Sequence, residues 1–134
     1  MQYDKIKNNN SNALPKKVKI SYLTYSIVQH EKFIQPEEDE TNNEAESDQL
    51  QLEKMGLLGN CSLLDSTINI YKHQVKEELV NTVLHEILHA ICWAQAMQLS
   101  NTVEEKVVLN FANGLCSFIR DNPKLVDWMQ ETLK

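Results

Sequence analysis

Three ionisable residues stand in the most apolar stretch of the chain, and their spacing indicates metal chemistry. The segment VLHEILHAICWA (83–94) is apolar except at His85, Glu86 and His89. An unpaired charge in apolar surroundings is costly, so such groups are normally neutralised, hydrogen-bonded or bound to a metal. On a helix, histidines four positions apart project from one face, about 6 Å apart along the axis, and both can reach one zinc ion. We therefore expect His85 and His89 to be zinc ligands.

Glu86 is expected to be the catalytic residue of the same site. It is turned about 100° around the helix axis from His85, so it lies beside the metal rather than on it. From there its carboxylate can accept a proton from a zinc-bound water. The alternative is a metal-free, hydrogen-bonded core cluster of the same three residues. Two of the four histidines occupy this five-residue HExxH motif, on the most apolar helix available, which favours the metal.

A hydrolytic zinc site needs a third protein ligand, and the neighbouring residues narrow the choice. Cys92 lies about 10.5 Å from His85 along a straight helix, too far to share the ion, so we expect a small core residue there. The extended motif HExxHxxGxxH is absent, because Cys92 replaces its glycine and Gln95 its last histidine. The remaining candidates are Glu104 and Glu105, at the start of the next helical segment.

Two arguments bear on the choice between these glutamates. Thr102 with Glu105, or Asn101 with Glu104, could form a capping box, so we expect one glutamate to cap the helix. Glu105 shares its helix face with a stripe that includes small residues and would let two helices approach closely: Val108, Leu109, Ala112 and Cys116. We favour Glu105 as the ligand, and Glu104 remains the alternative.

The surrounding patterns predict the elements that carry this site. Residues 18–28 alternate like one strand with an irregularity near Leu23, and residues 61–71 predict a hairpin that turns at Asp65 and Ser66. From Val75 the apolar period changes from two to about 3.6.

The helical pattern predicts three segments after the strands, over residues 75–99, 103–119 and 123–133. Strands followed by helices indicate an α+β fold rather than alternating α/β. Trp93 and Trp128 on these helices are expected to be packing groups.

Composition narrows the class of protein. The net charge is −6 and the one basic cluster, at Lys16, Lys17 and Lys19, is short, which disfavours binding to nucleic acid. No apolar run reaches the roughly 18 residues that span a bilayer, so we expect no membrane partner. Three isolated cysteines without a CxxC pair suit a reducing cytoplasm, where we expect the protein to act.

The chain is expected to form one domain. Residues 1–17 are polar and predict a flexible N-terminal arm, and residues 18–134 form the domain itself. Residues 36–53 hold eight of the nineteen acidic residues and predict a solvated loop.

The segments LLGNCSLLDSTINIY, NTVLHEILHAICW and EEKVVLNFANGLCSFIRDNP resemble small zinc metallopeptidases encoded by bacteriophages and prophages. These minimal zincins are distantly similar to SprT-like and ImmA/IrrE-type proteins, and the resemblance covers roughly residues 18–123. It implies a small, mostly antiparallel sheet on an active-site helix, one zinc per chain, and the cytoplasm of a bacterial host. It also implies that His85, His89 and Glu105 bind zinc and that Glu86 is catalytic. Residues 36–53 depart from the pattern as an insertion, and a zinc-ribbon CxxC pair is absent.

The expected function is zinc-dependent hydrolysis of a protein or peptide substrate. Residues 67–71 could form an edge strand that holds an extended substrate. Tyr71 and His73 could stabilise the oxyanion, although such residues at a strand end are more often ordinary surface groups. The alternative function is a non-catalytic, zinc-binding regulatory or interaction protein, and a metal-free helical module is a third possibility. The sequence does not indicate the oligomeric state.

Overall fold

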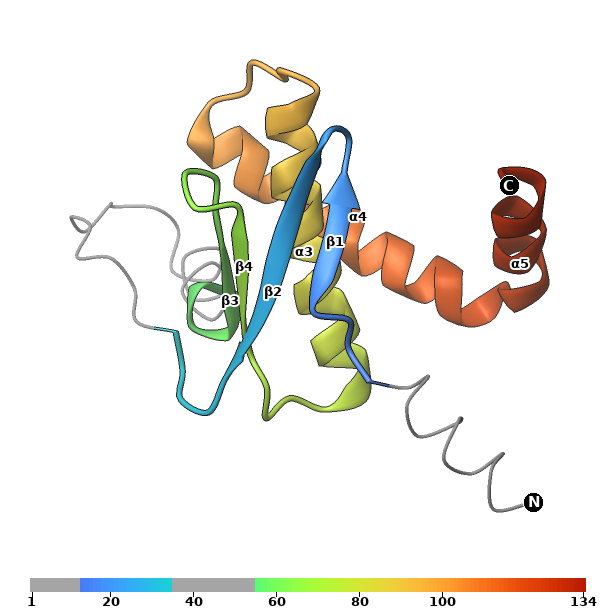
Figure 1. The fold of residues 1–134 in the computed structure, drawn as a ribbon, viewed down its shortest axis with the longest axis horizontal. Coiled ribbons are helices and arrows are strands. Elements are labelled where there is room, and N and C mark those ends of the chain that lie inside the picture. The colour runs from blue at the N-terminus through green and yellow to red at the C-terminus, as the bar shows by residue number, and fades with distance from the viewer. Residues whose placement is uncertain (1–12, 35–54) are drawn as a thin grey trace.

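The computed structural model describes residues 13–34 and 55–134, which form a four-stranded sheet covered by helices. The elements are β1 (Lys17–Ile20), β2 (Leu23–His30), β3 (Gly59–Ser62), β4 (Thr67–Tyr71), α3 (Lys76–Ala94), α4 (Asn101–Asp121) and α5 (Pro123–Thr132). Figure 1 shows α3 packed behind the sheet, α4 beside α3, and α5 projecting to one side. The predicted α+β class, with strands first and helices after, is confirmed.

The sheet has the order β1-β2-β4-β3. The two outer pairs are antiparallel and the central pair, β2 with β4, is parallel, so the sheet is mixed but mostly antiparallel. The predicted hairpin over residues 61–71 is confirmed as β3 and β4. The prediction that residues 67–71 form an edge strand is wrong, because β4 lies between β2 and β3.

The single strand predicted over residues 18–28 is instead a second hairpin. Ile20 pairs with Leu23 across a two-residue turn, and Ser21 adopts a φ of 58°, in the left-handed region used by tight hairpin turns. The shift in apolar phase near Leu23 is therefore the turn itself. It allows Ile20 and the buried residues of β2 to face the same helix.

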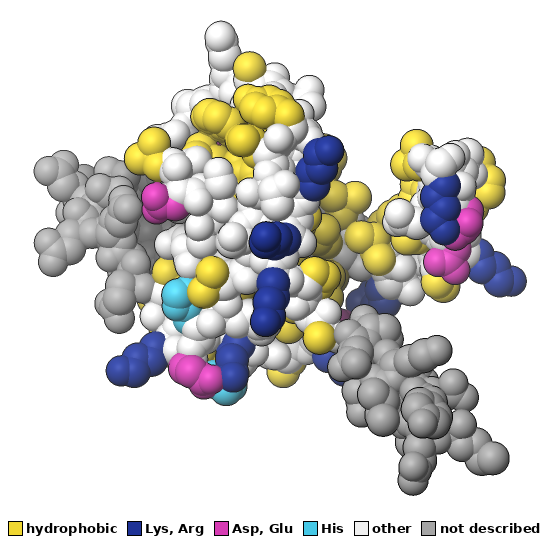
Figure 2. Space-filling view, in the orientation of Figure 1, with side chains coloured by type: hydrophobic (Ala, Val, Ile, Leu, Met, Phe, Trp, Pro, Cys, Tyr) yellow, Lys and Arg dark blue, Asp and Glu magenta, His cyan; other side chains and the backbone are white. Residues whose placement is uncertain are grey.

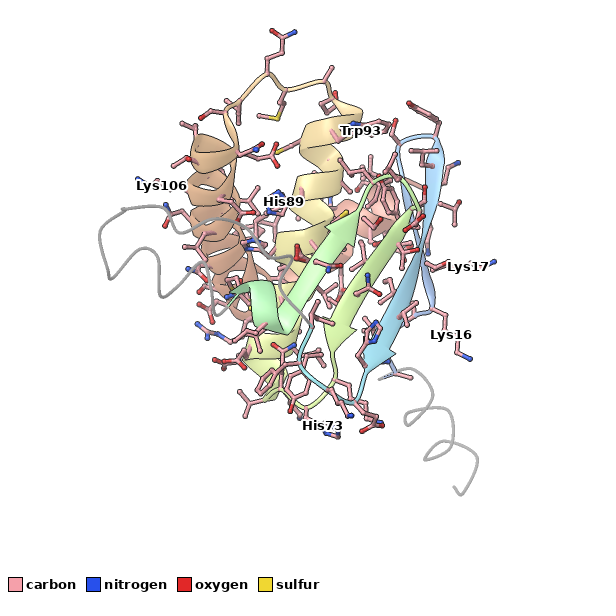
Figure 3. The ribbon with its side chains drawn as sticks, turned by 90° about the vertical axis from the view of Figure 1, so that its left-hand side faces the viewer. Lys16, Lys17, His73, His89, Trp93 and Lys106 are labelled. Carbon is pink, nitrogen blue, oxygen red and sulfur yellow. The ribbon has the colours of Figure 1, made fainter. Side chains whose placement is uncertain are left out.

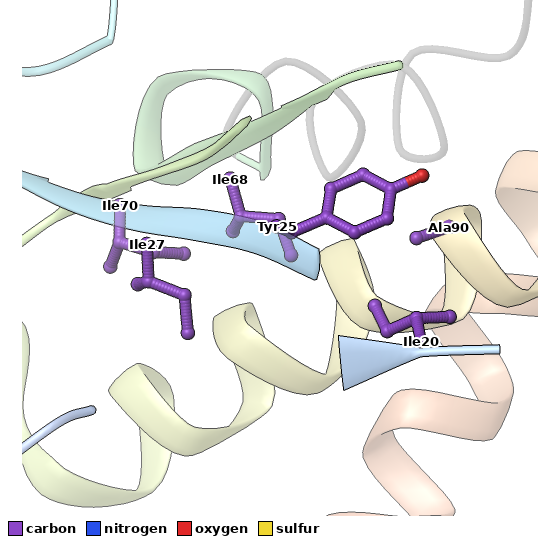
Figure 4. Packing of buried hydrophobic residues seen from close by; sticks show 6 residues of the cluster. All are labelled: Ile20, Tyr25, Ile27, Ile68, Ile70 and Ala90. Atoms are coloured by element: carbon purple, nitrogen blue, oxygen red, sulfur yellow. The ribbon is translucent and has the colours of Figure 1, made fainter. Parts of the chain in front are cut away.

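The core lies between the sheet and α3. It consists of Ile20, Tyr25, Ile27, Ile68, Ile70 and Ala90 (Figure 4). In β4 the buried residues alternate with half-buried ones, the pattern of a strand with one face against the core. Because Ala90 directly follows the HExxH motif, the core holds the motif's helical turn against the sheet.

The helices differ from the prediction at their ends. α3 stops at Ala94 rather than near residue 99, and Ala96 takes a φ of 52° just beyond it. α4 runs antiparallel to α3, since Asn81 donates a hydrogen bond to Asn113 at 2.6 Å near one end, and His89 meets Glu104 near the other. Within the described ranges, none of the helices is long and apolar enough to cross a membrane.

The last residues of the predicted N-terminal arm belong to the folded domain. Residues 1–12 lie outside the described residues, as does the acidic segment 36–53. Leu14 packs against the core, and the Lys16 carbonyl accepts a hydrogen bond from the Ile27 amide at 2.8 Å. The last residues assigned to the arm are therefore ordered parts of the sheet's edge.

Candidate metal centre

The structure brings His85, His89 and Glu105 together between α3 and α4. The two histidine Nε2 atoms are 3.2 Å apart. Glu105 places Oε1 3.0 Å from Nε2 of His89 and Oε2 3.3 Å from Nε2 of His85. Figure 3 shows His89 between the two helices. All three ligands expected from the sequence thus meet at one point.

The geometry of this triangle fits a zinc ion. In a tetrahedral site with bonds of 2.0 to 2.1 Å, neighbouring donor atoms lie roughly 3.3 to 3.4 Å apart. The two Nε2 atoms are 3.2 Å apart, and each lies within 3.3 Å of a carboxylate oxygen of Glu105, Oε1 for His89 and Oε2 for His85, so one ligand atom from each residue can converge on one ion. Two imidazole nitrogens and a carboxylate are also a donor set that zinc accepts, and a tetrahedron leaves a fourth position.

Local sequence explains why the two helices meet here. His85 and His89 lie one turn apart on the face of α3 that meets α4. On α4, Val108 and Ala112 are the buried residues, as expected for the small-residue stripe shared with Glu105. Because Ala112 is small, α4 can lie close enough to α3 for a carboxylate to reach both imidazoles. Cys92 is buried, as predicted, and does not belong to the cluster.

The expected capping boxes do not form. Ser100 is the N-cap of α4, and its hydroxyl accepts a hydrogen bond from the Val103 amide at 3.3 Å. Both glutamates therefore turn toward the histidines instead. Glu105 meets both Nε2 atoms, whereas Oε2 of Glu104 lies 2.7 Å from Nδ1 of His89, on the opposite side of the ring. Glu104 lies outside the donor triangle.

Glu86 is held beside the cluster in a nearly closed environment. Its exposed fraction is 4%, and burial raises the pKa of its carboxyl to about 8. The residue packs against Gly59 of β3, where a Cβ atom would lie 3.4 Å from Glu86 Cγ. The same atom would lie only 2.9 Å from Thr82 Cγ2 and 3.1 Å from the Asn69 carbonyl oxygen. Glycine is thus required where β3 crosses α3, a role that sequence reasoning missed although glycine in a strand is itself a signal of close approach.

The charges of the cluster are strongly coupled. Burial alone would raise the pKa of Glu105, but hydrogen bonds from His85 and His89 outweigh it and lower that pKa to about 2. Burial alone would lower the pKa of His89, but the hydrogen bond and charge of Glu105, together with Glu104, raise it to about 9. The carboxylates thus favour a positive charge at the position where a metal ion would supply one.

Cys61 is a further residue near the site that the sequence did not indicate. It lies on β3, and its thiol is half-buried. Burial, followed by the negative charges of Glu86 and Glu104, raises its pKa to about 12. The thiol is therefore protonated at neutral pH and contributes packing rather than a reactive thiolate.

Tyr71 and His73, the residues considered for oxyanion stabilisation, are not brought to the cluster. Tyr71 stacks on Phe33 with ring centroids 4.4 Å apart, and Nε2 of His73 lies 2.7 Å from Glu31. Figure 3 shows His73 at the end of the molecule away from His89. Both residues precede α3 and contact other residues near the surface, as the alternative in the sequence analysis expected.

Comparison of the chain with family models, with curated proteins and with solved structures gave no match, so the case for a function depends on the geometry of this centre.

Proposed function

We propose that the protein hydrolyses peptide bonds with one zinc ion held by His85, His89 and Glu105. The observation that carries the proposal is the convergence of the two Nε2 atoms, 3.2 Å apart, with the Glu105 carboxylate, whose oxygens lie 3.0 and 3.3 Å from them, a donor set that suits a tetrahedral ion. When bound, zinc would lower the pKa of a water molecule and polarise the scissile carbonyl. The sequence resemblance to small phage-encoded metallopeptidases supports the same reaction.

Glu86 is the general base in this proposal. Its carboxylate accepts the proton of the attacking water and returns it to the leaving amine. Burial raises the pKa of this carboxyl, a zinc ion beside it would oppose that shift and favour the carboxylate, and packing against Gly59 restricts its movement. A site that only held a metal for stability would not need a base at this position.

The strand that borders the site is β3, which replaces residues 67–71 as the candidate substrate strand. β3 packs against α3 and has β4 on one side only. Among the described residues, no strand pairs with its other edge. An extended peptide could form backbone hydrogen bonds along that edge, next to the cluster. This arrangement supports a peptide as the substrate.

Hydrolysis of a peptide library by zinc-loaded protein, read by mass spectrometry, tests the proposal. The control is Glu86→Gln, which preserves size and leaves the three ligands intact. We expect cleavage that requires zinc and falls by about 100-fold or more in the variant, at unchanged zinc stoichiometry. Zinc-loaded protein that cleaves no member of the library would contradict the proposal.

A non-catalytic, zinc-binding interaction protein is the second candidate. One observation favours it: α4 from Phe111 onward and α5 carry exposed apolar side chains, including Phe111 and Trp128. Large exposed apolar groups are typical of interaction surfaces. In that case Glu86→Gln would retain both zinc and partner binding, whereas the enzyme would lose its activity.

A further inference from the structure

We propose that Glu104 is a positioning residue of the metal centre, which orients His89 so that its Nε2 atom faces the ion. The inference rests on the proposed zinc site. It assigns Glu104 a role different from both roles expected from the sequence, the helix cap and the third ligand.

The hydrogen-bond geometry carries the argument. A neutral imidazole has one nitrogen that donates a hydrogen and one that offers a lone pair, and the partner of the first decides which is which. Nδ1 of His89 lies 2.7 Å from Oε2 of Glu104, and a carboxylate only accepts. Nδ1 therefore carries a hydrogen, so Nε2, which lies 3.0 Å from Oε1 of Glu105 and 3.2 Å from Nε2 of His85, is the nitrogen that would offer its lone pair to a bound ion.

Glu104 does not cap the start of α4. Ser100 provides the cap, so the carboxylate of Glu104 is available to the histidine. The other ligand offers a contrast, because Nδ1 of His85 is buried and has no hydrogen-bond partner among the described residues. Within the described ranges no hydrogen bond at Nδ1 orients His85, whereas a carboxylate at Nδ1 orients His89. The two ligands therefore depend on different parts of the fold.

The negative charge of Glu104 contributes to zinc binding in addition to orienting His89. A carboxylate hydrogen-bonded to Nδ1 increases the electron density on the imidazole and makes Nε2 a stronger ligand. Loss of the Glu104 carboxylate should therefore weaken zinc binding through His89, without removing a ligand. An amide in its place could still accept the Nδ1 hydrogen but would lack the charge.

The test compares zinc affinity, measured by competition with a chromophoric chelator, in the wild type, Glu104→Gln and Glu104→Ala. We expect Glu104→Ala to bind zinc about 10- to 100-fold more weakly, with Glu104→Gln between it and the wild type. Ser100→Ala is the matched control, since it weakens the same helical turn through the cap but leaves the His89 contact intact. It should bind zinc like the wild type. In zinc-loaded, ¹⁵N-histidine-labelled wild type, NMR should show the hydrogen on Nδ1 of His89.

Three results would overturn the inference: wild-type affinity in both Glu104 variants, an equal loss in Ser100→Ala, or a hydrogen on Nε2 of His89. Glu104→Gln keeps the test valid if the alanine variant folds poorly, because a neutral amide of the same size still accepts the hydrogen bond. Affinity is measured without a substrate, so the two proposals fail separately. Zinc binding in the expected order without peptide cleavage contradicts the proposed enzyme alone, and wild-type protein that binds no zinc overturns both.

Discussion

The first half of α4, taken as residues 101–112, and its second half, residues 113–121, differ sharply. The first half carries Glu104 and Glu105 and buries Val108 and Ala112 against α3. The second half adds no buried residue, nor does α5 after it. Figure 1 shows α5 standing apart from the sheet, and Figure 2 shows apolar side chains exposed on it. The candidate site and the packing that supports it are thus concentrated in one half of one helix pair.

The difference follows from the side chains at the contact. Ala112 in the first half permits close approach, whereas Phe118 and Ile119 in the second half are 37% and 38% exposed. Trp93 and Trp128 were expected to be packing groups, but they are 48% and 61% exposed, so that prediction is wrong.

The largest expected effect is on zinc affinity, when the carboxylate ligand in the first half of α4 is removed. Glu105→Gln preserves size but removes the carboxylate that meets both histidines. We expect zinc affinity to fall by about 100-fold or more, as for His85→Ala or His89→Ala, and the zinc-dependent rise in melting temperature to vanish. Thermal unfolding with zinc and with chelator measures this. If Glu105→Gln keeps the full zinc-dependent stabilisation, Glu105 is not a ligand.

Glycine-to-alanine substitutions compare the close packing of β3 against α3 with the open packing of the second half of α4. A Cβ at Gly59 would meet Thr82 and the backbone of Asn69 too closely, so Gly59→Ala should lower the free energy of unfolding by about 1 to 3 kcal/mol. Gly114, in the second half of α4, has nothing within 4 Å of an added Cβ. Gly114→Ala is the control and should raise stability by about 0.5 to 1 kcal/mol through helix propensity. Equal effects in chemical denaturation would show that β3 does not approach α3 as closely as described.

The buried carboxyl of Glu86 predicts a pH dependence in chelator-treated protein. Its pKa in the folded protein, about 8, exceeds the ordinary value of 4.5. Its contribution to stability is therefore fully present below pH 4.5 and is lost as the pH rises through about 8.

Glu86→Gln stays neutral, so it should escape this loss and melt about 5 °C or more above the wild type near pH 9, but not near pH 4.5. The raised pKa of His89 affects the stability of both proteins, so it largely cancels from the difference between their melting temperatures. Parallel melting curves of wild type and variant across this pH range would refute the raised pKa.

The smallest expected effect is the removal of α5. A chain that ends at Asp121 should bind zinc within about twofold of the wild type, because α5 buries no residue and stands apart from the sheet and α3. Chelator competition on the shortened protein measures it. A large loss of zinc affinity would show that the projecting helix supports the site and would remove the contrast between the two halves of α4.

Local periodicity was sufficient to predict much of this protein. The shared face of His85 and His89, and the position of Glu86 beside them, follow from helix geometry over five residues. The hairpin around Asp65 and Ser66 follows from turn-forming residues between two apolar runs. The α+β class follows from the change of period near Val75. Each of these features depends only on residues close together in the chain.

Features that join distant segments could not be determined in this way. The central place of β4 depends on its parallel pairing with β2, in which Ser26 lies opposite Thr67. The need for glycine at residue 59 depends on where β3 crosses α3. The different contacts of Glu104 and Glu105 depend on the cap at Ser100 and on the register between α3 and α4. A shift of one residue there turns a carboxylate by about 100° around the helix axis, and only the packing of the two helices decides which glutamate meets Nε2 and which meets Nδ1.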